Sequence, residues 1–171
     1  MAVTGIIAEY NPFHNGHLYQ LQKIKEQNPS TKFICVMSGS FTQRGNAAIL
    51  NKWQRASLAV AGGIDLVLEL PFVFAVRSAQ DFARGGTMLL ERLGLVDQIA
   101  FSTEYPNLAV LQHIAAQTDH PYTKVILKQA LEKGLPYAAA LSYALATRSG
   151  ISEDHLKQPN TILAIEYLRS L

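Results

Sequence analysis

The sequence has only one cysteine, Cys35, which excludes a disulfide bond within the chain. A lone cysteine is typical of a protein from a reducing compartment. No stretch reaches the roughly 18 uncharged apolar residues of a membrane span. The N-terminus also lacks a cationic segment followed by an apolar run and a cleavage site. We therefore expect a soluble, cytoplasmic protein with no membrane partner.

The chain also has little net charge. Fifteen Lys and Arg stand against thirteen Asp and Glu, which gives +2 at pH 7. No run of basic residues marks a nucleic-acid-binding arm, so a polyanionic partner is permitted but not indicated. With 171 residues, 49% hydrophobic and 16% charged, the composition predicts a globular chain with one good core, or a domain with an appendage.

Short apolar segments alternate with helical patterns over the first 105 residues. Four segments have the β-branched, apolar composition of buried parallel strands: residues 3–10, 32–38, 65–70 and 98–102. Three helical patterns lie between them, at residues 17–27, 51–63 and 78–93. This alternation predicts an α/β fold with a doubly wound, Rossmann-like parallel sheet.

The pattern becomes helical after Tyr105. Helices are predicted at residues 106–117, 122–133, 137–148 and 161–171. We expect residues 1–105 to form the α/β core, and residues 106–171 to pack on it and complete its ligand site. The last helical pattern has no stop signal, so we expect a longer natural polypeptide with a further region after Leu171.

The stretch EYNPFHNGHLYQL, from Glu9 to Leu21, connects the first strand to the first helix. In an open parallel sheet, ligands bind beyond the carboxyl ends of the strands. A helix N-terminus attracts phosphate, and Gly16 would let phosphates approach the backbone. His14 and His17 are three residues apart and can face one ligand. In a dry site, each donor would contribute on the order of 3 kcal/mol to charge in the transition state.

Two other interpretations of this stretch stay open. His14 and His17 could ligate a metal, but the other histidines are scattered and only one cysteine is present, so no ligand set is evident. An ordinary capping loop with solvated histidines would also fit His-x-x-His. The flanking strand, proline and glycine favour the phosphate site.

His-x-Gly-His after a first strand resembles the signature of the HIGH nucleotidyltransferase superfamily, which includes adenylyltransferases and class I aminoacyl-tRNA synthetases. Further blocks resemble the bacterial tRNA(Met) cytidine acetate ligase family. They cover nearly the whole chain in order: GIIAEYNPFHNGHL, VMSGSFTQRG, KWQRASLA, DLVLELPFVFA, SAQDFARGG and PNTILAIEY.

This resemblance implies an ATP-dependent ligase that activates acetate as acetyl-adenylate and passes the acetyl group to N4 of the wobble cytidine of elongator tRNA(Met). It implies that His14 and His17 act on the phosphates, with Mg²⁺ accompanying the triphosphate. Arg44, which follows the second strand at another carboxyl end, is the third candidate catalytic residue. The resemblance also implies an ATP site formed by one loop and two later positions: Ile7, Ala8, Glu9, Tyr10, Asn11, Pro12, Phe13, His14, Asn15, Gly16, His17, Leu18, Tyr19, Gln20, Ser102 and Asn160.

Several polar residues beside these blocks allow two interpretations each. Arg44 could bind phosphate or a substrate carboxylate through two hydrogen bonds, or be a solvated loop arginine. Lys52 and Arg55 open a helix, which is unfavourable for cations, so we expect Lys52 to face a ligand and Arg55 to be exposed. Trp53 is expected in the core. Asn160 could contact ATP or simply cap the last helix.

The chain departs from the usual family pattern near these blocks, at positions that include Asn46, Asn51, Ser102 and Thr161. Where family members have Phe-Gly-Ser-Glu, this chain has Ser102 in place of the glycine, which could crowd a nucleotide. Two alternatives to the ligase therefore stay open. One is an adenylyltransferase that moves AMP from ATP to a small phosphorylated acceptor. The other is a nucleotide- or RNA-binding paralogue with impaired chemistry.

Overall fold

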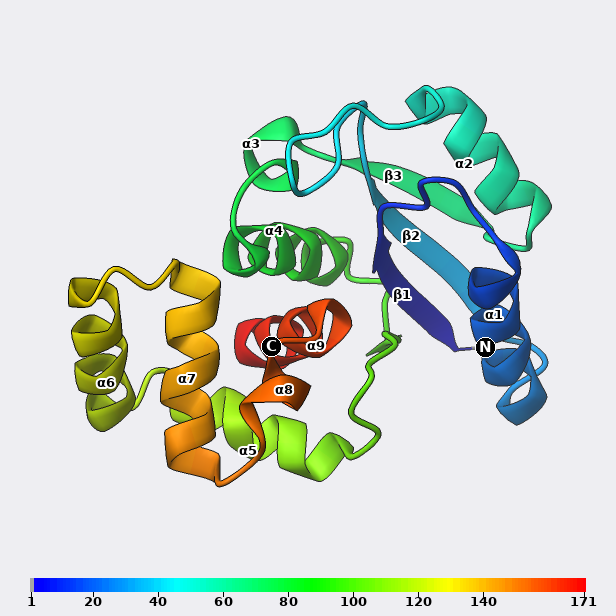
Figure 1. Ribbon diagram of the computed structural model, residues 1–171. Coiled ribbons are helices and arrows are strands. Elements are labelled where there is room, and N and C mark those ends of the chain that lie inside the picture. Colours follow the sequence, from blue (N-terminus) through cyan, green and yellow to red (C-terminus); the bar gives the residue numbers. More distant parts are fainter. Residues whose placement is uncertain (1) are drawn as a thin grey trace. The chain divides into compact units, whose positions relative to one another are not determined.

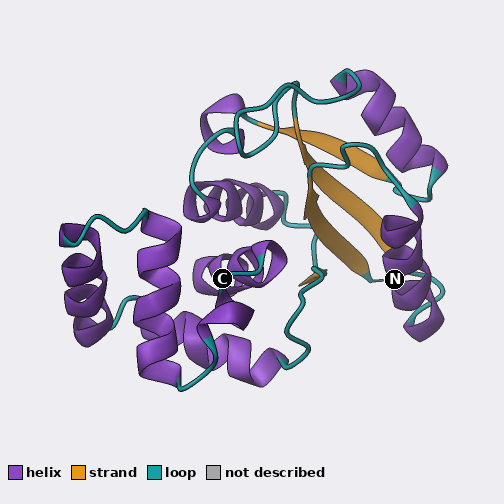
Figure 2. Cartoon of the chain, in the orientation of Figure 1, coloured by secondary structure: helices purple, strands orange, loops and turns teal. Residues whose placement is uncertain are grey.

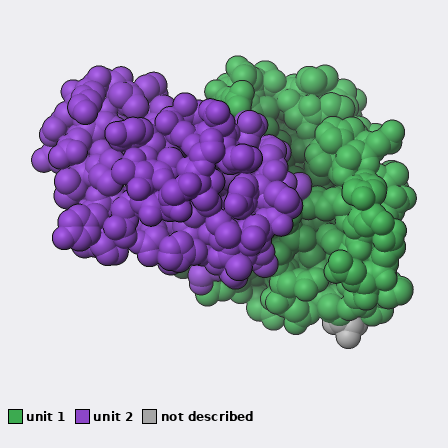
Figure 3. Space-filling model, turned by 60° about the horizontal axis from the view of Figure 1, so that its bottom comes forward, with its two compact units in different colours: residues 1–101 green, residues 102–171 purple. Residues whose placement is uncertain are grey.

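The computed structural model describes residues 2–171. The chain forms two compact units, residues 1–101 and residues 102–171, here called the α/β unit and the helical unit (Figure 3). The division expected from the sequence, after residue 105, and the packing of the second segment on the first remain predictions.

The α/β unit contains a four-stranded parallel sheet with the order β3-β2-β1-β4 (Figure 2). The strands are β1 (Val3–Ala8), β2 (Lys32–Ser38), β3 (Leu66–Leu70) and β4 (Gln98–Ile99). Although β4 has only two residues, side chains strengthen its pairing with β1. The Val3 N–H donates to Asp97 Oδ2 at 2.7 Å, and Gln98 Nε2 donates to Thr4 Oγ1 at 2.9 Å.

Helices cover both faces of this sheet (Figure 1). They are α1 (Asn15–Gln27), α2 (Lys52–Ala61), α3 (Phe72–Ala75) and α4 (Ala79–Arg92). Leu21 of α1 and Ala59 of α2 pack in one core with Ile6 and Phe33. On the opposite face, Ile7 contacts α4. The expected α/β fold with a doubly wound parallel sheet is therefore confirmed.

A glycine pair lets α4 approach its neighbours closely. A Cβ atom at Gly86 would lie 2.8 Å from the Ile7 side chain, and one at Gly85 would lie 2.5 Å from Phe74. Both distances are too short for a real contact, so glycine is needed at both positions for packing.

The helical unit contains α5 (Leu108–Thr118), α6 (Pro121–Glu132), α7 (Tyr137–Ser149), α8 (Glu153–Leu156) and α9 (Pro159–Ser170). Its core is made of buried aliphatic side chains that include Leu111, Ile114, Leu141, Leu145, Leu156 and Ile165. The single-turn helices α3 and α8 were not predicted, because one turn is too short to show a hydrophobic period. Within residues 2–171, no helix combines the length and the apolar character that a membrane span requires.

Candidate nucleotide site

The expected ATP loop lies at the switch point of the sheet. From β1, the chain builds β2 and β3 on one side and β4 on the other, and ligands of open α/β sheets bind where the order reverses in this way. Ile7 and Ala8 end β1, residues 9–13 form the connection, and residues 15–20 form the first turns of α1. The sequence therefore places its expected site where the topology favours one.

His14 and His17 cap the start of α1 reciprocally. Nδ1 of His14 accepts a hydrogen bond from the Gly16 N–H at 3.1 Å, and Nδ1 of His17 accepts one from the His14 N–H at 3.2 Å. The two rings stack, with centroids 3.7 Å apart and planes at 21°. This is a capping box built from imidazoles in place of Ser and Glu. It also explains why α1 begins at Asn15, two residues before the predicted start at His17.

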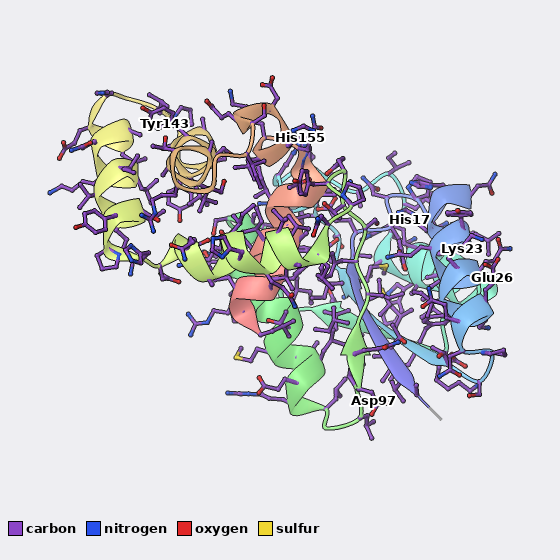
Figure 4. All side chains as sticks on the ribbon, turned by 90° about the horizontal axis from the view of Figure 1, so that it is seen from below. His17, Lys23, Glu26, Asp97, Tyr143 and His155 are labelled. Atoms are coloured by element: carbon purple, nitrogen blue, oxygen red, sulfur yellow. The ribbon has the colours of Figure 1, made fainter. Side chains whose placement is uncertain are left out.

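The capping bonds determine which nitrogen of each ring remains available. A neutral imidazole that accepts at Nδ1 carries its proton on Nε2, so each ring presents an Nε2–H donor. Burial lowers the pKa of His17 to about 4, with a further lowering by the neighbouring His14 ring. His17 is therefore neutral at pH 7 and remains a donor. In Figure 4, His17 lies on the first turn of α1, whereas the ion pair of Lys23 and Glu26, at 2.7 Å, lies further along the helix.

The glycine of His-x-Gly-His makes room for the ring of the first histidine. A Cβ atom at Gly16 would lie 2.9 Å from Cε1 and 3.1 Å from Nδ1 of His14. Any larger residue would push the ring away from the N–H group that it binds. Gly16 is therefore needed for the His14 cap, and it places no side chain over the positive end of the helix dipole.

Aromatic contacts hold the loop that leads to the histidines. Tyr10 is buried and has a positive φ of 44°, a conformation rare for a bulky residue. Its ring contacts Phe13 and His17 edge to face, with centroids 5.0 Å and 4.6 Å away. Backbone strain of this kind costs about 1–3 kcal/mol and persists where the surrounding structure requires it, often at ligand sites.

Arg44 lies at the exposed tip of a small hairpin after β2. The hairpin is closed by an antiparallel bridge between Phe41 and Ala47 and turns at Gly45, which has φ 81°. Two hydrogen bonds connect this segment to residues 9–14, which lead into α1 and are called the histidine loop here. The Glu9 carboxylate accepts from the Gln43 N–H, and Asn11 Oδ1 accepts from the Ile49 N–H at 2.8 Å.

Three expectations at the start of α2 have different outcomes. Arg55 is not exposed: it is fully buried and donates to the backbone carbonyls at the ends of β1 and β2. Trp53 is not in the core, because 74% of it is exposed at the outer face of the helix. Lys52 pairs with Glu69 at 2.6 Å. Asn51 caps this helix by accepting from the Gln54 N–H at 3.0 Å.

In the helical unit, Asn160 does not have the capping role that its sequence context suggests. Helix α9 begins at Pro159, and Asn160 donates from its backbone and its side chain to Glu104 Oε1, at 3.3 and 2.8 Å. The N–H and hydroxyl of Thr161 donate to Glu104 Oε2, at 2.8 and 3.0 Å. Glu104 thus satisfies the start of α9, which the sequence did not reveal.

These bonds also control the charge of Glu104. Burial on its own raises the pKa of this carboxyl group, but hydrogen bonds from Thr161 and Asn160 outweigh it and hold the pKa below its usual value. Glu104 is therefore ionised at neutral pH. Ser102, expected near the adenosine, is exposed at the start of the helical unit. The roles of Ser102 and Asn160 toward ATP remain predictions.

Two further observations concern charged groups. Arg77, just before α4, pairs with Asp81 in its first turn, with Nε and Oδ2 3.1 Å apart. Within residues 2–171, no three His, Cys, Asp or Glu side chains gather in a group that could hold a metal ion.

A switch-point loop of this kind, ending in a helix start that presents donors, defines a nucleotide-binding α/β fold. The chain belongs to the HIGH Nucleotidyl Transferase family, whose model matches residues 1–171. It is 47% identical to the tRNA(Met) cytidine acetate ligase of Syntrophomonas wolfei over 176 residues, which cover 99% of this chain and 42% of that protein. It is 44% identical to the protein of the same name from Acetivibrio thermocellus, over 100% of this chain and 42% of that one.

A solved structure is also similar. The crystal structure of Thermotoga maritima TmcAL bound with alpha-thio ATP matches with a TM-score of 0.88 at 39% identity, over 99% of this chain and 43% of that chain. The resemblance inferred from the sequence blocks is thus confirmed. The chain spans less than half the length of these relatives.

Proposed function

We propose that this chain is the nucleotidyltransferase part of a tRNA(Met) cytidine acetate ligase that works in the cytoplasm. It binds ATP at the β1–α1 junction and activates acetate. In the whole protein, the acetyl group then passes to N4 of the wobble cytidine of elongator tRNA(Met). The observation that carries this proposal is the reciprocally capped pair His14 and His17 at the switch point. The relative bound with alpha-thio ATP supports it.

In the activation step, a carboxylate oxygen of acetate attacks the α-phosphorus of ATP. The bond between that phosphorus and the oxygen leading to the β-phosphate breaks, and pyrophosphate leaves with the negative charge. The Nε2–H groups of His14 and His17 stabilise this charge together with the positive end of the α1 dipole. Because His17 is neutral at pH 7, it stabilises this charge by donating a hydrogen bond rather than as a cation.

The other site residues have roles that match their surroundings. Arg44 receives the acetate carboxylate through two parallel hydrogen bonds. The side-chain amide N–H of Asn160 is engaged with Glu104, so the amide oxygen remains to accept from a ribose hydroxyl or the adenine amine. Ser102 contacts the adenosine. These roles require residues 106–171 to pack on the α/β core and complete the site, which is part of the proposal.

Mg²⁺ would accompany the triphosphate at this site. Magnesium in nucleotide sites is commonly held by phosphate oxygens, waters and one or two carboxylates, so a protein cage is not required. Within residues 2–171, no three His, Cys, Asp or Glu side chains form a metal cluster, so phosphate oxygens and waters would supply most of the ligands. When bound, Mg²⁺ neutralises phosphate charge. The chain's own residues orient the phosphates.

In the transfer step, the N4 amine of cytidine attacks the acetyl carbonyl carbon. AMP leaves with the bridging oxygen, and the amine loses one proton to solvent. The decisive measurement is pyrophosphate exchange into ATP with a panel of acetate, formate, propionate and a small phosphorylated acceptor. Exchange that requires acetate supports the ligase. Exchange that requires the phosphorylated acceptor would indicate an adenylyltransferase. ATP binding without any exchange would indicate a paralogue with impaired chemistry.

Calorimetry with ATP tests the site itself. We expect His14→Ala and His17→Ala to weaken ATP binding about tenfold or more each, since each removes a donor to a charged group worth about 1.5–3 kcal/mol. Equal ATP affinity in the wild type and both variants would remove the histidines from the site.

A further inference from the structure

We infer that Arg55 is a positioning residue for acetate activation: it holds the Arg44 hairpin and the histidine loop in one arrangement. This inference rests on the proposed function, because it assigns Arg55 a part in placing the groups that bind ATP and acetate. Arg55 itself lies beneath these loops, fully buried, and needs no contact with substrate.

The guanidinium of Arg55 gathers backbone carbonyls from separate segments. Nε donates to the Leu50 carbonyl at 3.3 Å, where the hairpin segment runs into α2. One terminal nitrogen donates to the Glu9 carbonyl, directly after β1. The other donates to the carbonyls of Ser38, at 2.9 Å, and Gly39, at the end of β2. Among the described residues, all recorded acceptors of this cation are carbonyl oxygens.

Such an arrangement is unusual for a buried charge. Burying a guanidinium costs several kcal/mol unless hydrogen bonds compensate, and most buried cations pair with a carboxylate. Burial lowers the pKa of Arg55, and the charges of Glu9 and Glu69 oppose this. Because the N–H groups of this buried cation donate to the ends of two strands, Arg55 fixes the positions of these ends relative to each other.

Glu9 connects Arg55 to the hairpin. Its carbonyl accepts from Arg55, and its carboxylate accepts from the Gln43 N–H beside Arg44. The histidine loop and the hairpin therefore share one residue, which Arg55 fixes. The guanidinium also binds carbonyl oxygens at the carboxyl ends of β1 and β2. Its positive charge offsets their partial negative charge, which reduces their repulsion of an anion bound above them.

Lysine cannot replace this arrangement. Arginine offers five N–H groups in a rigid plane, whereas lysine offers one nitrogen on a flexible stem. We therefore expect Arg55→Lys to keep the charge but lose the simultaneous contacts to Glu9, Ser38 and Leu50. Arg55→Met removes the charge at similar length. Arg92→Met is the matched control, because Arg92 is exposed at the end of α4.

The first test uses acetate-dependent pyrophosphate exchange. A displacement of about 1 Å in a catalytic group can cost about 100-fold, so we expect Arg55→Met to lower kcat about 10- to 100-fold and raise the KM for acetate. The kcat of Arg55→Lys is expected to lie between those of Arg55→Met and the wild type. Arg92→Met should have the kcat and KM of the wild type. In the Arg55→Met background, Arg44→Ala should cost much less than in the wild type, since Arg44 is already misplaced. Full additivity of the two changes would overturn the inference.

The second test does not depend on activity. Hydrogen exchange should show lost protection at the Gln43 and Ile49 amides in Arg55→Met, while the amides inside β1 and β2 stay protected. If Arg55→Met does not fold, Arg55→Lys is used for the same comparison. Unchanged protection at Gln43 and Ile49 would overturn the positioning role, even if wild-type exchange requires acetate. Lost protection in a protein whose wild type shows no acetate-dependent exchange would support the positioning role and reject the proposed ligase activity.

Discussion

Acidification is expected to destabilise the α/β unit through His17. Burial lowers its pKa in the folded state to about 4, compared with about 6.5 in an unfolded chain. Between these values, the unfolded state binds more protons, so the stabilisation is complete above about pH 6.5 and is lost as the pH falls toward 4. The full shift corresponds to about 3 kcal/mol. Because the ring is only partly buried, solvent screening reduces the expected contribution to about 1–2 kcal/mol.

The assay combines an NMR titration of the His17 ring with urea unfolding at about pH 7 and about pH 4.5. We expect the wild type to lose about 1–2 kcal/mol more over this range than His17→Gln, which cannot titrate. His113→Gln, a change at an exposed histidine of α5, is the control and should follow the wild type. At about pH 7, the NMR chemical shift of Nε2 should be that of a neutral imidazole with its proton on Nε2. A titration midpoint near 6.5 would refute the reasoning, because it would mean that the ring is solvated.

Three other outcomes follow from the site. Gly16→Ala should displace the His14 ring, cost about 1 kcal/mol of helix capping and weaken ATP binding, as thermal unfolding and calorimetry would show; unchanged values in both would contradict the cap described here. Arg44→Lys should reduce acetate-dependent exchange about tenfold or more although the charge is kept, and unaltered exchange would place the carboxylate elsewhere. The chain should retain tRNA poorly, because its net charge is +2 and exposed cations such as Lys124 are paired, here with Asp119 at 3.3 Å. Filter binding at low and high salt checks this, and tight, strongly salt-dependent binding would show that the tRNA surface includes the helical unit.

The main features of the fold are predictable from local sequence. The β-branched segments around Ile6 and Val36 are apolar on both faces, as strands covered by helices require. The start of α1 was placed two residues late, because histidine is not a usual capping residue and the two rings act only as a pair.

Arg55 and Glu104 show why part of the site could not be predicted. The partner of Arg55 in the histidine loop lies 46 residues away, and Glu104 binds an amide 56 residues away. Neither contact has a local pattern. Only the position of Arg55 in the first turn of α2, where the helix dipole disfavours a cation, indicates that it has another role. Trp53 was misplaced for a related reason, since hydrophobicity alone does not determine which face of a helix is covered.

The pairing of β1 with β4 has a consequence for synthesis on the ribosome. Thr4 of β1 binds Gln98, which is added 94 residues later. At about 5–20 residues per second, one edge of β1 stays unpaired for roughly 5–20 s after the strand has been made. Residues 3–8 carry no charge, so this open edge can pair with other nascent chains. The strand that leads into the histidine loop is therefore made before the other strands of this sheet and is enclosed only when β4 pairs with it. The yield of native protein should respond to translation speed and to chaperones that cover extended apolar segments.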